Sequence, residues 1–416
     1  TKEKRKEKVF NRRNTVLDQM VKNKYLSEGK AAQLKKLPVK INFKPESHAE
    51  GTATYFREYL REQLKPIIKA IEEEKGEEID LYTAGLKIYT TVDSRMQQYA
   101  EEAVEEHLSN LQPEFNRRQK DNPTAPFLDI TPEETQKIMN QAMKNSERWR
   151  IMSINGKSDA EIKQSFEVPA KMKIFTWKGE RDTIMKPKDS ILYYKHFLQT
   201  GMMAMEPQTG HVKAWVGGIN YKYFQYDHVG QGARQVGSTF KPFVYATAID
   251  RLGKSPCDMI MDSPFTILKG DNNDKDWTPN NSDGKFRGLV SMKKALANSI
   301  NTVSARLIHE VGAPAVVEMT KNLGVTSDIP NRPAIALGAV EITVEEMVAA
   351  FSTFANEGVY IKPQLITKIE DKNGVVIYQG VEESHDVVNK DVAYSIIKLM
   401  EGVTESGTGS RLRWAA

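Results

Sequence analysis

Apolar residues near the start of the chain recur every three or four positions. The segment 3–35 is otherwise dominated by Lys, Arg and Glu, and its apolar members are Val9, Phe10, Val16, Leu17, Met20 and Leu26. A helix turns once every 3.6 residues, so residues at this spacing share one face. The pattern predicts one or two amphipathic helices. Two prolines within 36–48 break it and indicate a linker or an extended segment.

The pattern changes several times before residue 200. Residues 52–75 have helical periodicity, 86–92 alternate like a short strand, and 95–111 are helical again. Residues 112–200 mix short helical and strand patterns, and Thr131 with Glu134 forms a capping-box signature for one helix. This stretch is interpreted as an inserted or accessory module.

From residue 201 the pattern becomes more regular. MMAMEP and HVKAWVGG read as two short strands joined by a turn, and a helix is predicted over 238–252. Further helices are expected around 291–311 and 344–357, and Asn373-Gly374 marks a hairpin turn.

Composition places only loose limits on domain number, binding partners and redox compartment. The chain has 416 residues, enough for two or three domains, with 27% charged residues and a mean hydropathy of −0.53. A net charge of +4 suits an anionic surface but is too small to indicate nucleic acid. No apolar run reaches 18 residues. Cys257 is the only cysteine, so an internal disulfide is excluded and the redox compartment stays open.

The first candidate chemistry is the segment RQVGSTFKPFVYATAID, residues 234–250. Ser238 and Lys241 stand three positions apart, so on a helix they share a face. Serine becomes nucleophilic when a neighbour accepts its proton, and lysine does so when desolvation keeps it partly neutral. Pro242 lacks an N–H and fits the first turn of a helix. Ser-x-x-Lys alone is a weak pattern, because surface helices contain it by chance.

A second candidate segment, MKKALANSINTVSARLI, follows about sixty residues later. Ser299 and Asn301 lie there at an expected break between two helices. A serine and an amide two residues apart could relay a proton and hold a substrate amide. Together the two segments suggest a serine acyl-transfer site.

These two segments resemble the first two signature motifs of the penicillin-binding proteins and serine β-lactamases. The resemblance extends to MAMEPQTGHVKAWVGG, WTPNN, IALGAVEITVEEMVAAFSTFANEG and ESGTGSRL, which are similar to the transpeptidase domain of bifunctional class A penicillin-binding proteins. It implies that Ser238 forms the acyl-enzyme, that Lys241 is its base, that Ser299 shuttles the proton and that Asn301 binds substrate. It also implies the α+β fold of penicillin-binding proteins and serine β-lactamases, in which an antiparallel sheet packs against helices. The reaction it implies needs no metal and no organic cofactor.

The resemblance divides the chain into four parts. Residues 1–37 are similar to the end of a glycosyltransferase domain, 38–111 to the interdomain linker, 112–200 form the accessory module, and 201–416 are similar to the transpeptidase domain. The family's third motif, Lys-Thr/Ser-Gly, is expected after Gly407-Thr408-Gly409 and does not occur before residue 416. Lys372-Asn373-Gly374 is a turn instead, so the site is expected to be incomplete. The glycosyltransferase carboxylates are expected upstream of residue 1.

Three functions remain open at this point. The first is a D,D-transpeptidase that cross-links peptidoglycan stem peptides and is trapped by β-lactams. The second is a hydrolase of the same chemistry, a D,D-carboxypeptidase or β-lactamase. The third is a folded but inactive fragment. The resemblance implies D-Ala-D-Ala stem peptides as substrate and elongation or division proteins as partners, and no nucleic acid. It also implies a location at the outer face of the cytoplasmic membrane, through an anchor outside this segment.

Other polar residues are expected to be structural. His228 has no triad signature around it and is interpreted as a loop residue. The acidic loop 270–276 lacks the ligand spacing of a calcium site and is interpreted as solvated. Trp277 could line a groove or pack in the interior, and it is left out of the candidate catalytic set.

Overall fold

The computed structural model describes residues 2–39, 48, 50–270 and 274–413, and it separates into two compact units, Thr1–His48 and Ala49–Ala416. The first unit contains α1 (Lys2–Lys22) and α2 (Glu28–Lys36), which confirms the predicted pair of helices. Among the side chains that the structure describes in this pair, Leu17 and Ala31 are the buried apolar ones. The guanidinium of Arg13 donates to the carbonyl oxygens of Leu37 and Lys35 at 2.7 and 3.0 Å. Most of the predicted linker over 36–48 lies outside the described residues.

Two long helices open the second unit. These are α3 (Thr54–Lys75) and α4 (Ser94–Arg118), with β1 (Lys87–Thr90) between them. The carboxylate of Asp93 accepts the N–H groups of Arg95 and Met96 and so caps α4. α4 passes through Pro113 and ends seven residues beyond the predicted end. α3 packs on the C-terminal part of the chain, where the ring of Tyr59 stacks on Trp215 with centroids 4.4 Å apart.

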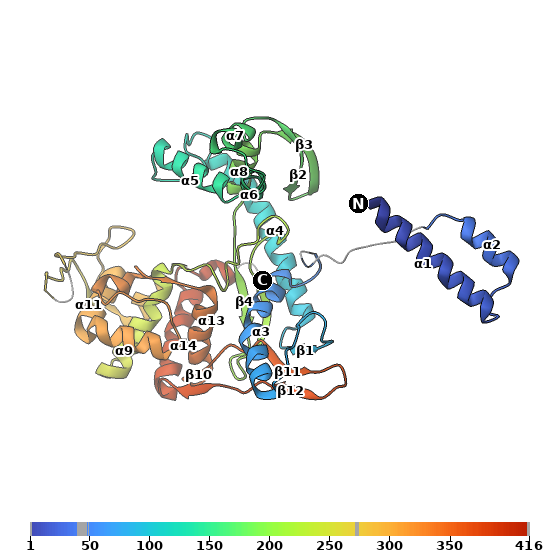
Figure 1. Cartoon of the computed structure of the whole chain (residues 1–416). Helices are drawn as coiled ribbons and strands as arrows, with labels where there is room; N and C mark the ends of the chain where they lie inside the picture. Colours follow the sequence, from blue (N-terminus) through green and yellow to red (C-terminus); the bar gives the residue numbers. More distant parts are fainter. Residues whose placement is uncertain (1, 40–47, 49, 271–273, 414–416) are drawn as a thin grey trace. The chain divides into compact units, whose positions relative to one another are not determined.

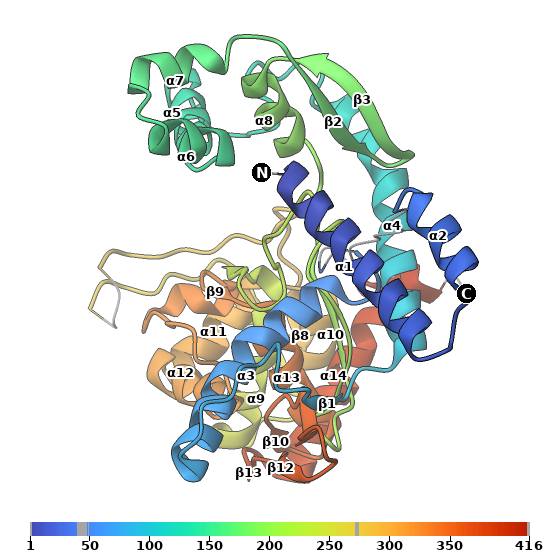
Figure 2. The same cartoon turned by 45° about the vertical axis from the view of Figure 1, so that its right-hand side comes forward.

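Residues 132–195 form a module with its own small core. It comprises α5 (Pro132–Lys144), α6 (Glu147–Ile154), α7 (Asp159–Ser165), the β2–β3 hairpin (Ala170–Thr176 and Gly179–Met185) and α8 (Pro187–Lys195). Met143, Ile162 and Phe166 pack together at its centre. The predicted capping box of Thr131 and Glu134 is present at the start of α5. In both views the module lies apart from α9 and α11 (Figures 1 and 2).

The remaining chain folds into small antiparallel sheets and a cluster of helices. The strands are β4 (Met202–Met205), β5 (Val212–Val216), β6 (Arg234–Gln235), β7 (Met259–Asp262), β8 (Gly288–Ser291), β9 (Glu341–Ile342), β10 (Val359–Ile361), β11 (Ile366–Glu370), β12 (Val376–Gln379) and β13 (Ser384–Asp386). One sheet has the order β1-β11-β12, and the pairs β4-β5, β6-β9, β7-β8 and β10-β13 are two-stranded. β1 therefore ties the start of this unit to a strand about 280 residues later. Asn373-Gly374 lies between β11 and β12, which confirms the predicted hairpin turn.

The helices of this region are α9 (Lys241–Leu252), α10 (Met292–Ala297), α11 (Asn301–Val311), α12 (Ala313–Asn322), α13 (Val344–Ala355) and α14 (Lys390–Glu405), with 3₁₀ turns η1 (Gly237–Phe240), η2 (Pro333–Leu337) and η3 (Ser410–Arg413). α9 lies at their centre and contacts α11, α12 and α14. Its residues from Lys241 to Ile249 are all buried. A helix buried on every side is held in one position, so the turn that precedes it is fixed as well.

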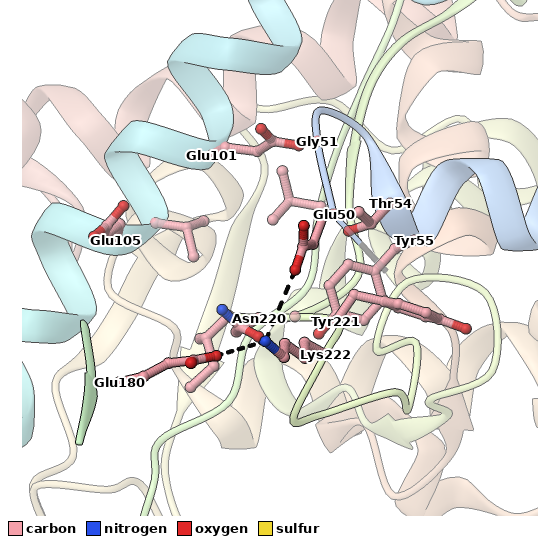
Figure 3. Close-up of a pocket in the computed structure, with 14 residues that line it drawn as sticks. Glu50, Gly51, Thr54, Tyr55, Glu101, Glu105, Glu180, Asn220, Tyr221 and Lys222 are labelled. Atoms are coloured by element: carbon pink, nitrogen blue, oxygen red, sulfur yellow. Dashed lines mark hydrogen bonds and ion pairs between the residues drawn. The ribbon is translucent and has the colours of Figure 1, made fainter. Parts of the chain in front are cut away.

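The module meets the C-terminal region at a polar junction. A cavity of about 400 Å³ lies between α3, α4, β3 and residues 216–222, as Figure 3 shows. Its ionisable lining includes Glu50, Glu101, Glu105 and Glu180, and the ammonium of Lys222 contacts Glu180 at 2.6 Å and Glu50 at 3.8 Å. The pair with Glu180 connects the β2–β3 hairpin with residues 216–222, and the pair with Glu50 connects the same segment with the chain just before α3.

Aromatic packing strengthens the same junction. Phe175 of β2 and Tyr194 of α8 contact Phe224 edge to face, with centroid distances of 5.6 and 5.5 Å. Tyr194 also stacks on Tyr223 at 5.8 Å. Because such packing excludes water and prefers defined ring geometry, the module is attached by a specific contact.

Candidate active site

Ser238 lies in the turn that leads into the buried helix α9. The 3₁₀ turn η1 spans Gly237–Phe240, and the N–H of Lys241 donates to the carbonyl oxygen of Ser238. Pro242 has no N–H with which to make the α-helical bond to that carbonyl, so the 3₁₀ bond takes its place. The hydroxyl of Ser238 is exposed, whereas the next helical residues are buried. The predicted placement of Ser238 at a helix start is confirmed.

The chain just before Ser238 is braced by a close backbone contact. Gly237 has φ +56° and Gly338 has φ +73°, and a Cβ on Gly338 would lie 1.8 Å from the carbonyl oxygen of Gly237. The N–H of Gly237 donates to the carbonyl of Gly338 at 3.2 Å, and that of Val236 to Val340 at 3.1 Å. Only glycine permits this approach at position 338. The contact fixes where η1 begins.

Lys241 is buried and points into a set of oxygen atoms. Its side chain is 1% exposed, and its Nζ lies 2.7 Å from the carbonyl oxygen of Ser299, 3.0 Å from Ser299 Oγ and 2.7 Å from Asn301 Oδ1. Burial disfavours the charged ammonium and lowers the pKa of Lys241 to about 8. A lysine with this pKa is partly neutral near physiological pH, so it can accept a proton.

Ser299 connects Lys241 with Ser238. It lies between α10 and α11, and its hydroxyl is 2.9 Å from Ser238 Oγ and 3.0 Å from Lys241 Nζ. Its φ of +54° is a left-handed conformation that is uncommon for residues other than glycine. Strained backbone of this kind persists where the surrounding structure enforces it and is frequent at functional sites. The three side chains form a continuous hydrogen-bonded path.

Asn301 begins α11 and is held from two sides. Its Oδ1 accepts from Lys241, and its Nδ2 donates to the carbonyl oxygen of Asn280 at 2.8 Å. Its backbone N–H donates to Asn281 Oδ1 at 2.9 Å, so Asn281 supplies an N-terminal cap for α11 from another loop. The structure therefore brings together all four residues that the sequence selected.

A buried acid behind these residues was missed by the sequence reasoning. Asp262, at the end of β7, is fully buried and accepts hydrogen bonds from Asn281 Nδ2 at 2.7 Å and Thr302 Oγ1 at 2.6 Å. Burial alone would raise its pKa, but bonds from Thr302, Asn281 and Arg287 outweigh burial and lower the pKa. The WTPNN segment hinted at Asn281, but no local pattern marks Asp262.

The Ser-x-x-Lys spacing occurs at four other places in the chain, and burial separates them from Ser238. These pairs are Ser27/Lys30, Ser282/Lys285, Ser291/Lys294 and Ser395/Lys398. Lys30, Lys285 and Lys294 are exposed, and the Lys398 side chain is 41% exposed. Of these five lysines, Lys241 alone is buried, so it alone experiences the desolvation that a proton acceptor needs.

The residues interpreted as structural lie outside this cluster. His228 packs against Tyr226, with ring centroids 5.0 Å apart, and burial lowers its pKa. Trp277 pairs by backbone hydrogen bonds with Ile267 at 2.9 Å, and its ring is partly buried. Within the described residues no group of three His, Cys, Asp or Glu side chains could hold a metal ion. Part of the acidic loop, residues 271–273, lies outside them.

None of the helices in the described part of the chain is long and apolar enough to cross a membrane.

Two protein families match most of the second unit. The family "Penicillin-binding protein middle domain" matches residues 122–198, and the family "Penicillin binding protein transpeptidase domain" matches residues 200–415. Penicillin-binding protein 1A of Rickettsia bellii is 28% identical over 98% of this chain and 55% of its own length. That of Aquifex aeolicus is 28% identical over 97% and 54%. The chain thus spans about half the length of these curated relatives.

Solved structures show the same fold. The crystal structure of penicillin-binding protein 1A from Haemophilus influenzae matches with a TM-score of 0.65 at 22% identity, over 98% of this chain and 66% of that one. PonA1 from Mycobacterium tuberculosis in complex with penicillin V matches with a TM-score of 0.50 at 20% identity, over 84% of this chain and 70% of that one. The expected penicillin-binding-protein fold is confirmed. Because the transpeptidase family matches more than half of its residues, the chain belongs to the penicillin-binding proteins with a transpeptidase domain.

Proposed function

We propose that this chain is a serine-type D,D-transpeptidase that cross-links peptidoglycan stem peptides, with Ser238 as nucleophile. The observation that carries the proposal is the path from exposed Ser238 through Ser299 to buried Lys241, with heavy-atom distances of 2.9 and 3.0 Å. A hydroxyl becomes an effective nucleophile when such a path removes its proton.

The proposed acylation moves one proton and one electron pair along this path. Ser238 Oγ attacks the carbonyl carbon of the penultimate D-alanine while its proton passes to Ser299, whose own proton passes to neutral Lys241 Nζ. Hydroxyl hydrogens can rotate, so the same oxygen positions serve both directions of transfer. The tetrahedral intermediate then breaks its C–N bond. The protons return through Ser299 to the leaving amine of the terminal D-alanine, and the acyl group remains on Ser238 as an ester.

The second half-reaction repeats these steps with a new amine. The amino group of a neighbouring stem peptide attacks the ester carbonyl, loses a proton to the same path and restores the Ser238 hydroxyl. Asn301 would orient the peptide, because its Nδ2 carries a second hydrogen besides the one donated to Asn280. A β-lactam undergoes the first step only as a ring opening, since its nitrogen stays attached to the acyl group.

The proposal extends to the cellular setting. We propose that the longer protein of this kind also carries peptidoglycan glycosyltransferase activity, because residues 1–37 resemble the end of a glycosyltransferase domain. Lipid-linked peptidoglycan at the outer face of the cytoplasmic membrane would be its substrate, and elongation or division proteins its partners. The division into residues 1–37, 38–111, 112–200 and 201–416 remains a prediction.

Intact-mass spectrometry after incubation with penicillin V tests the proposal. We expect one adduct of the full β-lactam mass on the chain, and none on Ser238→Ala. The matched control is Ser395→Ala, which removes the serine of another Ser-x-x-Lys pair and should leave the adduct unchanged. An adduct that persists in Ser238→Ala, or no adduct on the folded parent chain, would refute the assignment. Rapid turnover to ring-opened product would identify a hydrolase instead.

A further inference from the structure

A second cavity, of about 580 Å³, lies where the β2–β3 hairpin and α8 of the module meet the end of α4. It shares no lining residue with the Ser238 site, and α8, which helps to line it, lies apart from α9 in both views (Figures 1 and 2). Its volume is within the range of small-molecule sites, roughly 300–1,000 Å³. Its lining includes Trp177, Tyr193, Phe197, Asp189, His196 and Asn116.

Three aromatic rings form an apolar wall of this cavity. Trp177, Tyr193 and Phe197 are each partly exposed, and Phe197 lies 5.2 Å from the ring of Tyr193 and 6.3 Å from that of Trp177. Partly exposed rings gathered in one hollow offer flat apolar surface to a ligand that has an apolar face.

The wall is held in place by partly buried hydrogen bonds. Gln112, 5% exposed, donates to the carbonyl oxygen of His196 at 2.7 Å and accepts the N–H of Leu198 at 2.9 Å. The hydroxyl of Tyr193 donates to the carbonyl oxygen of Phe175 at 2.7 Å. These bonds fix α8 and the chain after it on α4 and β2. A preformed cavity loses less entropy when it binds a ligand.

Polar side chains beside the rings keep hydrogen-bond donors or acceptors that a ligand could engage. Asp189 is exposed, and across the described part of the chain no hydrogen bond or ion pair engages its carboxylate. His196 Nδ1 is 2.9 Å from the carbonyl oxygen of Leu192, which assigns the proton to Nδ1 and leaves Nε2 as an acceptor in the neutral ring. Asn116 accepts from Gln112 with Oδ1 and keeps its amide hydrogens to donate. The ligand must therefore both donate and accept hydrogen bonds.

The charges around the cavity disfavour both cationic and anionic ligands. Residues 170–196 contain seven Lys or Arg and three Asp or Glu, a difference of four positive charges that disfavours a cationic ligand. The carboxylate of Asp189, inside the cavity, disfavours an anion. A neutral ligand with several hydroxyl groups and a flat apolar face satisfies all these groups. We propose that this cavity is a saccharide-binding site, in which a sugar ring lies against the aromatic wall and its hydroxyls bond to Asp189, His196 and Asn116.

The source of the saccharide depends on the proposed function, whereas the binding chemistry does not. If the chain acts on peptidoglycan, the glycan strand is the saccharide, and the site would hold that strand while Ser238 reacts with its peptides. An N-acetylated sugar oligomer and a glucose oligomer distinguish the sources, because they share ring shape but differ in the acetamido group.

Isothermal titration calorimetry on the 416-residue chain tests the site with chitotetraose, cellotetraose and a stem-like pentapeptide. We expect chitotetraose to bind, and Asp189→Asn and Trp177→Ala each to raise its dissociation constant at least tenfold. Asp182→Asn is the matched control, since Asp182 is an exposed acid of β3 outside the cavity lining, and it should bind as the parent does. Ser238→Ala should also bind unchanged, so failure of catalysis and failure of this site can be told apart.

The titration results either support or contradict the saccharide site. Equal binding of both oligosaccharides supports a saccharide site that does not read the acetamido group. Binding of the peptide alone, no binding of either sugar, or equal affinity in the parent and in Asp189→Asn would overturn the proposal. Asp189→Asn keeps the shape of an exposed side chain, so the test stands even if Trp177→Ala does not fold.

Discussion

Raising the pH from 7 to 9 should increase the rate at which a β-lactam acylates Ser238 by about tenfold. In the proposed reaction only neutral Lys241 accepts a proton. With a pKa of about 8, about one tenth of Lys241 is neutral at pH 7 and about nine tenths at pH 9. At its ordinary pKa of 10.5, only about 3 in 10,000 molecules would be neutral at pH 7. Burial thus provides a several-hundredfold gain in reactive enzyme.

The assay is the second-order rate of adduct formation with penicillin V, measured from pH 6 to 9.5 at constant ionic strength. The rate should rise with an apparent pKa of about 8 and then level off. Asp250→Asn, far along α9 on a partly exposed position, serves as a control that should leave the profile unchanged. A flat profile, or one that falls between pH 7 and 9, would refute Lys241 as the base.

The same pKa has a consequence for stability. Because the folded pKa of Lys241 lies below its unfolded value, the unfolded chain binds more protons between about pH 8 and 10.5. Stability contributed by this residue is therefore lowest below pH 8 and is regained as pH rises towards 10.5. The free energy of unfolding, relative to Lys241→Met at each pH, should rise by about 2–3 kcal/mol from pH 7 to 10. Urea denaturation measures it, and a constant difference would contradict the depressed pKa.

Three further substitutions test the groups around the site. Asp262→Ala should lower the free energy of unfolding by about 3–5 kcal/mol in urea denaturation, because it leaves the buried donors of Asn281 and Thr302 without an acceptor. An unchanged free energy of unfolding would show that these hydrogen bonds do not stabilise the fold. Ser299→Gly should relieve a left-handed backbone and stabilise by up to about 1 kcal/mol, yet slow acylation about a hundredfold, and unchanged acylation kinetics would exclude the proton path. Gly338→Ala should cost about 3 kcal/mol in thermal or urea unfolding, because its Cβ meets the carbonyl oxygen of Gly237. Gly253→Ala, also at positive φ but in open space, should cost only about 1 kcal/mol; equal losses would show that the close contact is unimportant.

Several elements followed from local sequence alone. Pro242 and the apolar run after it predict a helix start near Ser238, Thr131 with Glu134 predicts a capping box, and Asn373-Gly374 predicts a hairpin turn. Each depends on interactions within a few residues, so no distant contact was needed. The end of α4 was misjudged, because the helix continues past Pro113 to Arg118; buried Gln112, next to the proline, is anchored by hydrogen bonds to His196 and Leu198.

The family resemblance selected Ser238, Lys241, Ser299 and Asn301 together, but their contact was decided by the fold. Lys241 contacts Ser299 and Asn301, which lie about sixty positions later in the sequence. Asp262 and Asn281, which support the site, belong to two further segments of the chain. Pairing of β1 with β11 was likewise invisible, since strand partners hundreds of residues apart leave no local signal.

The five Ser-x-x-Lys pairs show most clearly what the sequence determined and what the tertiary structure decided. Sequence by itself determined their spacing and the likelihood of a helix at Ser238, and it could not rank the lysines by reactivity, since a pKa depends on the surroundings of the amine. The tertiary structure packs α9, which begins at Lys241, against α11, α12 and α14, and it leaves the other four lysines in contact with water. Sequence therefore determined which groups are available, and burial, which only the packed chain provides, decided which one can act as a base.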